Sequence, residues 1–248
     1  GLLAVAENLK CQNAAVAVEK IGRLLISRFG GNPSEILSIG NHQGLSSAVI
    51  IEPLAKLSLA TGDSIFADLA VRLVDAMEDQ GLSILSGPAH NLDVSELGTG
   101  KSYQICWILN GLVALSRATK KTEYTSHLTP LGGPWGGIAT HKEVFNAKGF
   151  FSPEGLTETC STASWMDLCS ELYFESGDTK YVEAFELSLR NALLGAMDEN
   201  GADWSYFTFP NGRRNSTYYW ACCKSSGAMA LERSAELALT QTKAGLSV

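Results

Sequence analysis

The sequence lacks the features that would assign it to several common classes of protein. It has no run of Lys or Arg and carries a net charge of −7, which argues against nucleic acid and anionic membranes as partners. No apolar run reaches the ~18 residues of a membrane span. No signal-peptide pattern is visible. The chain starts at Gly1 rather than Met, so a removed leader, and with it a periplasmic or secreted location, stays open beside a cytoplasmic one.

Two signatures of metal and nucleophile sites are missing as well. The chain has no Cys-x-x-Cys pair, the usual form of a structural zinc site, and its four histidines have no recognisable partner motif. Six cysteines in 248 residues do not suggest a disulfide scaffold. They are Cys11, Cys106, Cys160, Cys169, Cys222 and Cys223. We expect Cys11 to be inert, and Cys106 and Cys169 to lie on apolar helix faces in the core.

What the sequence does contain is a series of amphipathic helices. Its 45% apolar and 18% charged residues are ordinary for a globular protein, and the length suffices for one domain with a substantial core. We therefore expect a single helical, catalytic-type domain over residues 1–248. Apolar periodicity predicts helices at about 13–28, 47–60, 66–77, 103–118, 162–175 and 179–197, and one more after Cys223.

Three of these helices end in a similar elbow. The elbows are Thr61-Gly62-Asp63, Thr119-Lys120-Lys121 and Ser176-Gly177-Asp178. They begin 58 and 57 residues apart, and an aromatic residue occupies the sixth position of each, at Phe66, Tyr124 and Tyr181. We expect these aromatics to pack between helical hairpins. An internal repeat of hairpins predicts an all-α fold, either an α/α toroid or an α-solenoid.

The hairpins are fewer than a closed toroid needs. Three hairpins, with one helix before and one after, make about four units, whereas six hairpins of ~57 residues would need roughly 340 residues. We therefore expect a truncated piece, a compact variant, or an open arc completed by an oligomeric partner or a missing segment. Glycine-rich connections such as 131–137 and a short β-hairpin at about 203–212 interrupt the helices. A site would be built on such connections.

The adjacent thiols of Cys222 and Cys223 need an explanation, because a disulfide between them would close a strained ring. Upstream, Glu158 and Cys160 would face the same way in an extended segment. A helix after Cys223 would lower the pKa of both adjacent thiols through its N-terminal dipole. Three thiolates and one carboxylate could surround a zinc ion, with buried unliganded cysteines as the alternative. Glu143 is the candidate proton donor, with a solvated loop glutamate as its alternative.

Several segments occur in an order that identifies a family. They are Glu52-Pro53-Leu54, Ser102-Tyr103-Gln104, Glu158-Thr159-Cys160, residues 165–169, residues 191–195 and Cys222-Cys223. Together they resemble glycoside hydrolase family 127 (GH127), the zinc- and cysteine-dependent β-L-arabinofuranosidases, over most of residues 44–232. The resemblance implies an (α/α)6 barrel, incomplete here, and a retaining glycosidase of carbohydrate metabolism.

The resemblance also implies the roles of individual residues. Zinc would be held by Glu158, Cys160, Cys222 and Cys223. Cys222 would attack the anomeric carbon of the sugar. Glu143 would act first as general acid and then as general base. The implied partner is a carbohydrate, a β-L-arabinofuranoside or a related sugar.

Sugar contacts and alternative functions complete the expectations. His42 and His141 are the candidates for the family's sugar-contacting histidines, and Lys101 stands where many members have histidine. The first alternative function is a non-catalytic helical-repeat module with a structural zinc or thiolate site. The second is a cysteine hydrolase of another type, in which Cys222 pairs with His141.

Overall fold

The computed structural model describes residues 1–126, 128, 140–141, 143–150, 152–212, 214–215, 222–238, 240–242 and 245–247. The chain divides into two compact units. Unit 1 comprises residues 1–92, 97–99 and 107–128, and unit 2 comprises residues 93–96, 100–106 and 129–248. Among the described residues, no helix is long and apolar enough to cross a membrane. The single domain expected over residues 1–248 stays a prediction.

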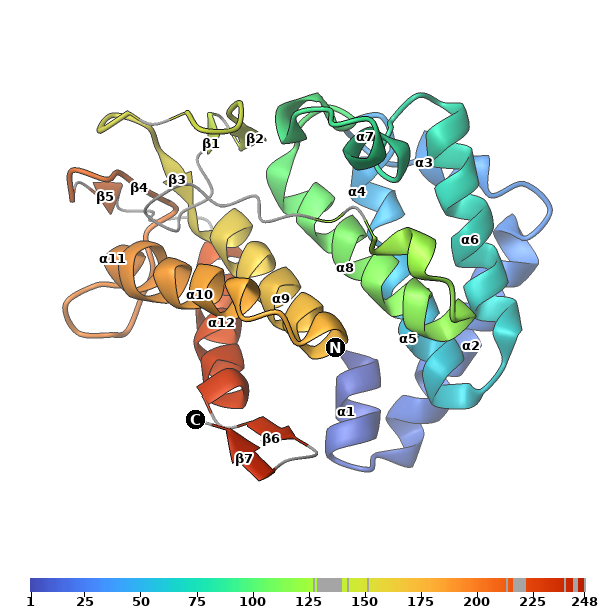
Figure 1. The fold of residues 1–248 in the computed structure, drawn as a ribbon. Helices are drawn as coiled ribbons and strands as arrows, with labels where there is room; N and C mark the ends of the chain where they lie inside the picture. The colour runs from blue at the N-terminus through green and yellow to red at the C-terminus, as the bar shows by residue number, and fades with distance from the viewer. Residues whose placement is uncertain are drawn as a thin grey trace. The chain divides into compact units, whose positions relative to one another are not determined.

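Unit 1 is built of helices (Figure 1). Its elements are α1 (Leu2–Asn8), α2 (Gln12–Phe29), α3 (Ser34–Ser38), α4 (Leu45–Ala48), α5 (Ile51–Thr61), α6 (Ser64–Asp79), α7 (Ser86–Ala89), most of α8 (Ser102–Thr119) and the 3₁₀ turn η2 (Thr122–Tyr124). Helices α5 and α6 form a hairpin against which α2 packs. The apolar stripe of α6 is buried, with Phe66, Leu73 and Met77 at most 1% exposed, as its periodicity predicts.

Unit 2 combines helices with three small antiparallel sheets (Figure 1). Its elements are η1 (Val94–Glu96), the first turn of α8, β1 (Thr140–His141), β2 (Val144–Phe145), β3 (Thr157–Glu158), α9 (Thr159–Ser176), α10 (Lys180–Leu187), the π-helical η3 (Ser188–Leu193), α11 (Leu194–Ala196), β4 (Phe207–Thr208), β5 (Arg214–Asn215), α12 (Cys222–Ala238), β6 (Thr240–Thr242) and β7 (Gly245–Ser247). The sheets are β1-β2, β3-β4-β5 and β6-β7. Helix α9 packs against α10 and α12 and supplies most of the buried side chains around the site.

The three elbows stop their helices by the same local chemistry. The left-handed residues are Gly62 (φ +72°), Lys120 (φ +60°) and Gly177 (φ +70°), the conformation that ends many helices. Just before them, the hydroxyls of Thr61, Thr119 and Ser176 donate to the carbonyl four residues earlier, at 2.8, 2.7 and 2.7 Å. The aromatics that follow the elbows are at most 5% exposed. The repeated elbows and the burial of their aromatics are confirmed, whereas the repetition of whole hairpins stays a prediction.

Most predicted helices are confirmed, with ends that move by a few residues, and two regions differ. The helix expected at 47–60 is broken into α4 and α5, and Pro53 lies in the first turn of α5, where its missing N–H is tolerated. The second elbow is followed by the short turn η2 rather than by a long helix like those that follow the other two elbows. The glycine-rich connection 131–137 lies outside the described residues. The predicted β-hairpin is present as β4 and β5.

Candidate metal centre and active site

Three cysteines from two helices meet in unit 2. Cys160 is the second residue of α9, and Cys222 and Cys223 open α12. The three sulfur atoms all lie within 4.8 Å of one another, and those of Cys160 and Cys223 are 3.1 Å apart. All three cysteines are free. Sulfur ligands ~2.3 Å from a tetrahedral zinc ion lie about 3.8 Å apart, so the donor set and its spread fit zinc.

The packing of α9 against α12 produces this convergence. Cys160 touches Cys223, and ten residues further along each helix Ser170 accepts a hydrogen bond from Arg233 at 2.7 Å. Equal steps along both helices mean that α9 and α12 run side by side in the same direction, with both N-termini at the thiols. The positive ends of two helix dipoles therefore favour negative charge on the sulfur atoms.

The three thiols differ in their affinity for a proton. The pKa of Cys160 is lowered to about 7, chiefly by a hydrogen bond from Cys223. The pKa of Cys223 is raised by that same hydrogen bond and by burial, and the pKa of Cys222 is raised by burial and by the charge of Cys160. The expectation that the helix start lowers the pKa of both adjacent thiols is therefore wrong for the metal-free site, because the shared negative charge settles on Cys160.

The three cysteines also differ in how far they are exposed to solvent. Cys160 and Cys223 are 4% and 1% exposed, whereas Cys222 is partly exposed. Among the three, Cys222 is therefore the residue most open to solvent, while Cys160 and Cys223 are enclosed by packed side chains. Two buried donors beside one accessible thiol is an arrangement suited to holding an ion next to a reactive group.

Glu158 ends strand β3 and occupies the N-cap position of α9. Its residue is 4% exposed, and burial raises the pKa of its carboxyl to about 7. Oε2 accepts a hydrogen bond from Ser161 at 2.6 Å. The extended segment expected through Cys160 ends at Glu158, because α9 begins at Thr159. The Glu158 carboxylate is not among the atoms that group within 4.8 Å, and its role as the fourth ligand stays a prediction.

Glu143 lies in the turn between β1 and β2 and is held from several sides. The Lys101 ammonium donates to its Oε2, and the Tyr206 hydroxyl donates to its Oε1. Its backbone carbonyl accepts hydrogen bonds from the backbone N–H and the hydroxyl of Ser102, at 3.1 and 3.0 Å. The Glu143 side chain is 27% exposed. It is therefore a partnered carboxylate rather than a solvated loop glutamate.

Tyr206 is a site residue that the sequence patterns do not single out. The pKa of its phenol is raised, first by burial and then by the charges of Glu158 and the three clustered cysteines. The same hydroxyl donates a hydrogen bond to the Glu143 carboxylate. Its backbone carbonyl also accepts from the Thr159 N–H at 3.0 Å, which ties the segment to the start of α9. The only sequence signal was its place in an aromatic stretch that predicts a strand.

The remaining candidates are the two histidines expected to contact sugar and the two cysteines expected in the core. His42 lies in an exposed turn of unit 1, whose position relative to the thiols of unit 2 is not defined. The backbone of His141 forms part of β1, and its side chain lies outside the described part of the chain. Cys106 and Cys169 are fully buried, as expected, and burial raises the pKa of both thiols.

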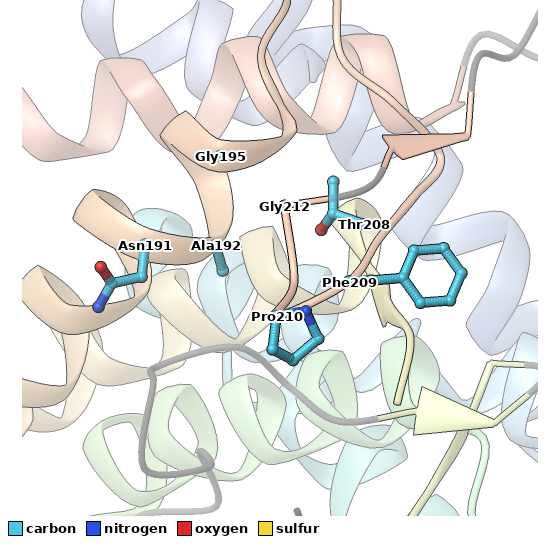
Figure 2. Close-up of a pocket in the computed structure, with 7 residues that line it drawn as sticks. All are labelled: Asn191, Ala192, Gly195, Thr208, Phe209, Pro210 and Gly212. Atoms are coloured by element: carbon cyan, nitrogen blue, oxygen red, sulfur yellow. The ribbon is translucent and has the colours of Figure 1, made fainter. Parts of the chain in front are cut away.

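A separate hollow of about 240 Å³ lies between the η3–α11 helical segment and the β4–β5 turn (Figure 2). Its lining residues are Asn191, Ala192, Gly195, Thr208, Phe209, Pro210 and Gly212. Figure 2 shows Asn191 and Ala192 on the helical side and Pro210 and Gly212 on the turn. None of the lining residues is ionisable or nucleophilic apart from one threonine hydroxyl.

Residues 135–236 match the family model of the GH127 catalytic domain of β-L-arabinofuranosidase. This segment contains the carboxylates Glu143 and Glu158 and all three clustered cysteines. The resemblance read from the order of motifs is confirmed. No curated protein matches the sequence.

Solved structures match the fold. A GH127 β-arabinofuranosidase is 20% identical, with a TM-score of 0.54, over 75% of this chain and 32% of its own. A GH127 β-L-arabinofuranosidase from Geobacillus stearothermophilus T6 is 15% identical, with a TM-score of 0.56, over 82% of this chain and 42% of its own. A glycoside hydrolase is 14% identical, with a TM-score of 0.56, over 83% and 39%. The chain thus spans less than half the length of these structures, and the predicted fold class, a mainly helical chain of the α/α-barrel type, is confirmed.

Proposed function

We propose that this chain, which carries a GH127 catalytic segment, is a zinc-dependent retaining glycoside hydrolase that acts on β-L-arabinofuranosides or related sugars. The observation that carries the proposal is the convergence of three sulfur atoms within 4.8 Å, two of them buried and one accessible. Those cysteines and both candidate carboxylates fall inside the matched residues 135–236.

Zinc would be held by the sulfurs of Cys160, Cys222 and Cys223, with Glu158 as the fourth ligand. When bound, the ion supplies positive charge that keeps its thiol ligands deprotonated at neutral pH. That supply is needed, since the pKa of the accessible Cys222 thiol is raised in the metal-free site. Cys222 is the proposed nucleophile because it is the most exposed of the three cysteines, whereas Cys223 and Cys160 would act as buried ligands.

The proposed reaction has two steps. In the first, Cys222 Sγ bonds to the anomeric carbon while the glycosidic C–O bond breaks, and Glu143 gives its proton to the leaving oxygen. In the second, a water oxygen bonds to the anomeric carbon, the C–S bond breaks, and Glu143 takes the proton of that water. Two inversions at the same carbon give net retention of configuration.

The test combines metal analysis with a matched pair of cysteine variants. Purified protein is expected to contain one zinc per chain and to hydrolyse nitrophenyl β-L-arabinofuranoside with retention, which nuclear magnetic resonance of the first-formed sugar reports. Cys222→Ser is expected to keep the fold and lose hydrolysis by at least ~10³-fold. Cys11→Ser is the control, because Cys11 lies in unit 1 outside the cluster.

Two results would overturn this assignment. One is protein without zinc in which Cys222→Ser hydrolyses the glycoside as fast as the parent chain. The other is bound zinc whose removal by a chelator lowers the melting temperature while no aryl glycoside is turned over by any preparation. The second result would favour the non-catalytic module with a structural metal site.

A further inference from the structure

Lys101 and Tyr206 each contact one oxygen of the Glu143 carboxylate. The Lys101 ammonium donates to Oε2 and the Tyr206 hydroxyl donates to Oε1, so each oxygen has its own partner. The Lys101 side chain is 10% exposed, and its contact with Glu143 is therefore screened only weakly by water. A lysine whose nitrogen is engaged with a protein carboxylate is poorly placed to contact a sugar.

The backbone holds Glu143 in the same place. Its φ is +67°, a left-handed conformation that is uncommon for a residue with a side chain and persists where the surroundings fix it. Ser102, the residue after Lys101, donates to the Glu143 carbonyl through both its N–H and its hydroxyl. The Ser102 and Ser161 hydroxyls are 2.6 Å apart, and Ser161 in turn bonds Glu158. The start of α8 therefore holds both the main chain and the side chain of Glu143.

We propose that Lys101 and Tyr206 are positioning residues for Glu143: Lys101 fixes Oε2 and favours the ionised form of the carboxylate, and Tyr206 orients Oε1, the oxygen that exchanges the proton. The expected effect on kinetics rests on the proposed function, whereas the expected effect on the titration of Glu143 rests on the geometry alone. The inference gives Lys101 a role toward the acid–base residue in place of the sugar contact that the resemblance implies.

The consequence concerns the pH at which Glu143 carries a proton. An ammonium in contact favours the charged form of a carboxylate, so the protonated fraction needed for the acid step falls away at a lower pH than it would without Lys101. Among the described residues, Tyr206 also contacts the Glu143 carboxylate, and Glu158 is connected to the Glu143 backbone carbonyl through the two serines. Its chain neighbours His141 and Lys142, whose side chains lie outside the described residues, are changed separately to Gln so that their contributions can be subtracted.

The experiment follows Glu143 directly and through turnover. The protonated carboxyl is read by infrared difference spectra against Glu143→Gln, a signal that needs no enzymatic activity. In Lys101→Met we expect this transition and the basic limb of kcat/KM to move up together by about 1 pH unit. In Lys101→Arg both stay within a few tenths of the parent values. Lys148→Met, on the same connection but exposed, is the matched control.

Tyr206→Phe removes only the hydroxyl and keeps the ring. We expect kcat to fall ~10- to 100-fold with KM changed less than about threefold, and the carboxyl transition to move up as well. The inference is wrong if Lys101→Met raises KM alone and leaves both transitions in place, because Lys101 would then contact the sugar. If no protein hydrolyses glycosides but the infrared transition moves as expected, the proposed function fails and the positioning of Glu143 stands. If Lys101→Met does not fold, an unmoved transition in Tyr206→Phe is sufficient to refute the inference.

Discussion

Replacing Arg233 tests whether the pairing of α9 with α12 is what assembles the thiol cluster. Its guanidinium forms ion pairs with Asp167 at 3.2 Å, Glu171 at 2.6 Å and Glu236 at 2.5 Å. The side chains of Arg233, Asp167 and Glu171 are 20%, 22% and 11% exposed, whereas that of Glu236 is 56% exposed. The first two pairs are therefore weakly screened and join the two helices, and the third is a surface contact within α12.

The magnitude follows from this division. Removing one partner of a buried ion pair costs about 3–5 kcal/mol, because the remaining charge stays desolvated. The residual exposure of Arg233 lowers that figure, and the Glu236 pair adds at most about 0.5 kcal/mol. We expect Arg233→Met to lower the free energy of unfolding by about 2–4 kcal/mol. The matched control is Arg190→Met, whose pair with Glu186 is 71% and 54% exposed and should cost no more than about 0.5 kcal/mol.

The assay is urea unfolding of the metal-free proteins, with zinc affinity measured by competition against a chromophoric chelator. Because the ion pairs lie seven to eleven residues from the thiols on the same two helices, Arg233→Met should weaken zinc binding at least ~10-fold, while Arg190→Met should leave it unchanged. The reasoning would be refuted if Arg233→Met lost less than about 1 kcal/mol of unfolding free energy and bound zinc as tightly as the parent protein. This comparison requires that the slope of the unfolding free energy against urea concentration is unchanged.

Two further predictions concern Glu158 and the packing of α12. In metal-free protein, the raised Glu158 pKa means that the folded state keeps a proton the unfolded state releases, so stability falls by roughly 3 kcal/mol as pH rises from about 4.5 to about 7. Glu158→Gln should remove that fall in pH-dependent urea midpoints, and an unchanged profile would contradict the assignment. A Cβ at Gly227 would lie 2.5 Å from the Trp204 ring, so Gly227→Ala should cost about 1–3 kcal/mol despite its better helix propensity. Gly195→Ala, with nothing within 4 Å, should instead be neutral or stabilising by roughly 0.5 kcal/mol in the same thermal melts, and equal effects would contradict the clash.

The sequence by itself determined the helices and the elements of the site. Apolar periodicity places α2, α6 and α8, because each helix buries one stripe whose spacing is a property of the helix alone. The elbows at Gly62 and Gly177 are equally local, since a left-handed residue and a hydroxyl one position earlier are enough to end a helix. The order of Glu143, Glu158 and the cysteines was sufficient to indicate the resemblance to GH127, whose catalytic-domain model matches residues 135–236.

Only the tertiary structure decided how those elements act on one another. The contact of Lys101 with Glu143 joins residues 42 apart, and those of Tyr206 with Glu143 and Cys160 with Cys223 join residues 63 apart. No local pattern encodes such pairs, because they depend on how α8, β4, α9 and α12 pack. The same packing decides which thiol holds the charge: a helix start favours thiolate at Cys222 and Cys223 alike, but burial and a shared hydrogen bond assign it to Cys160. The sequence shows which thiols and carboxylates are candidates for the site. Their distances and their burial, which depend on segments far apart in the chain, decide which of them carries the charge.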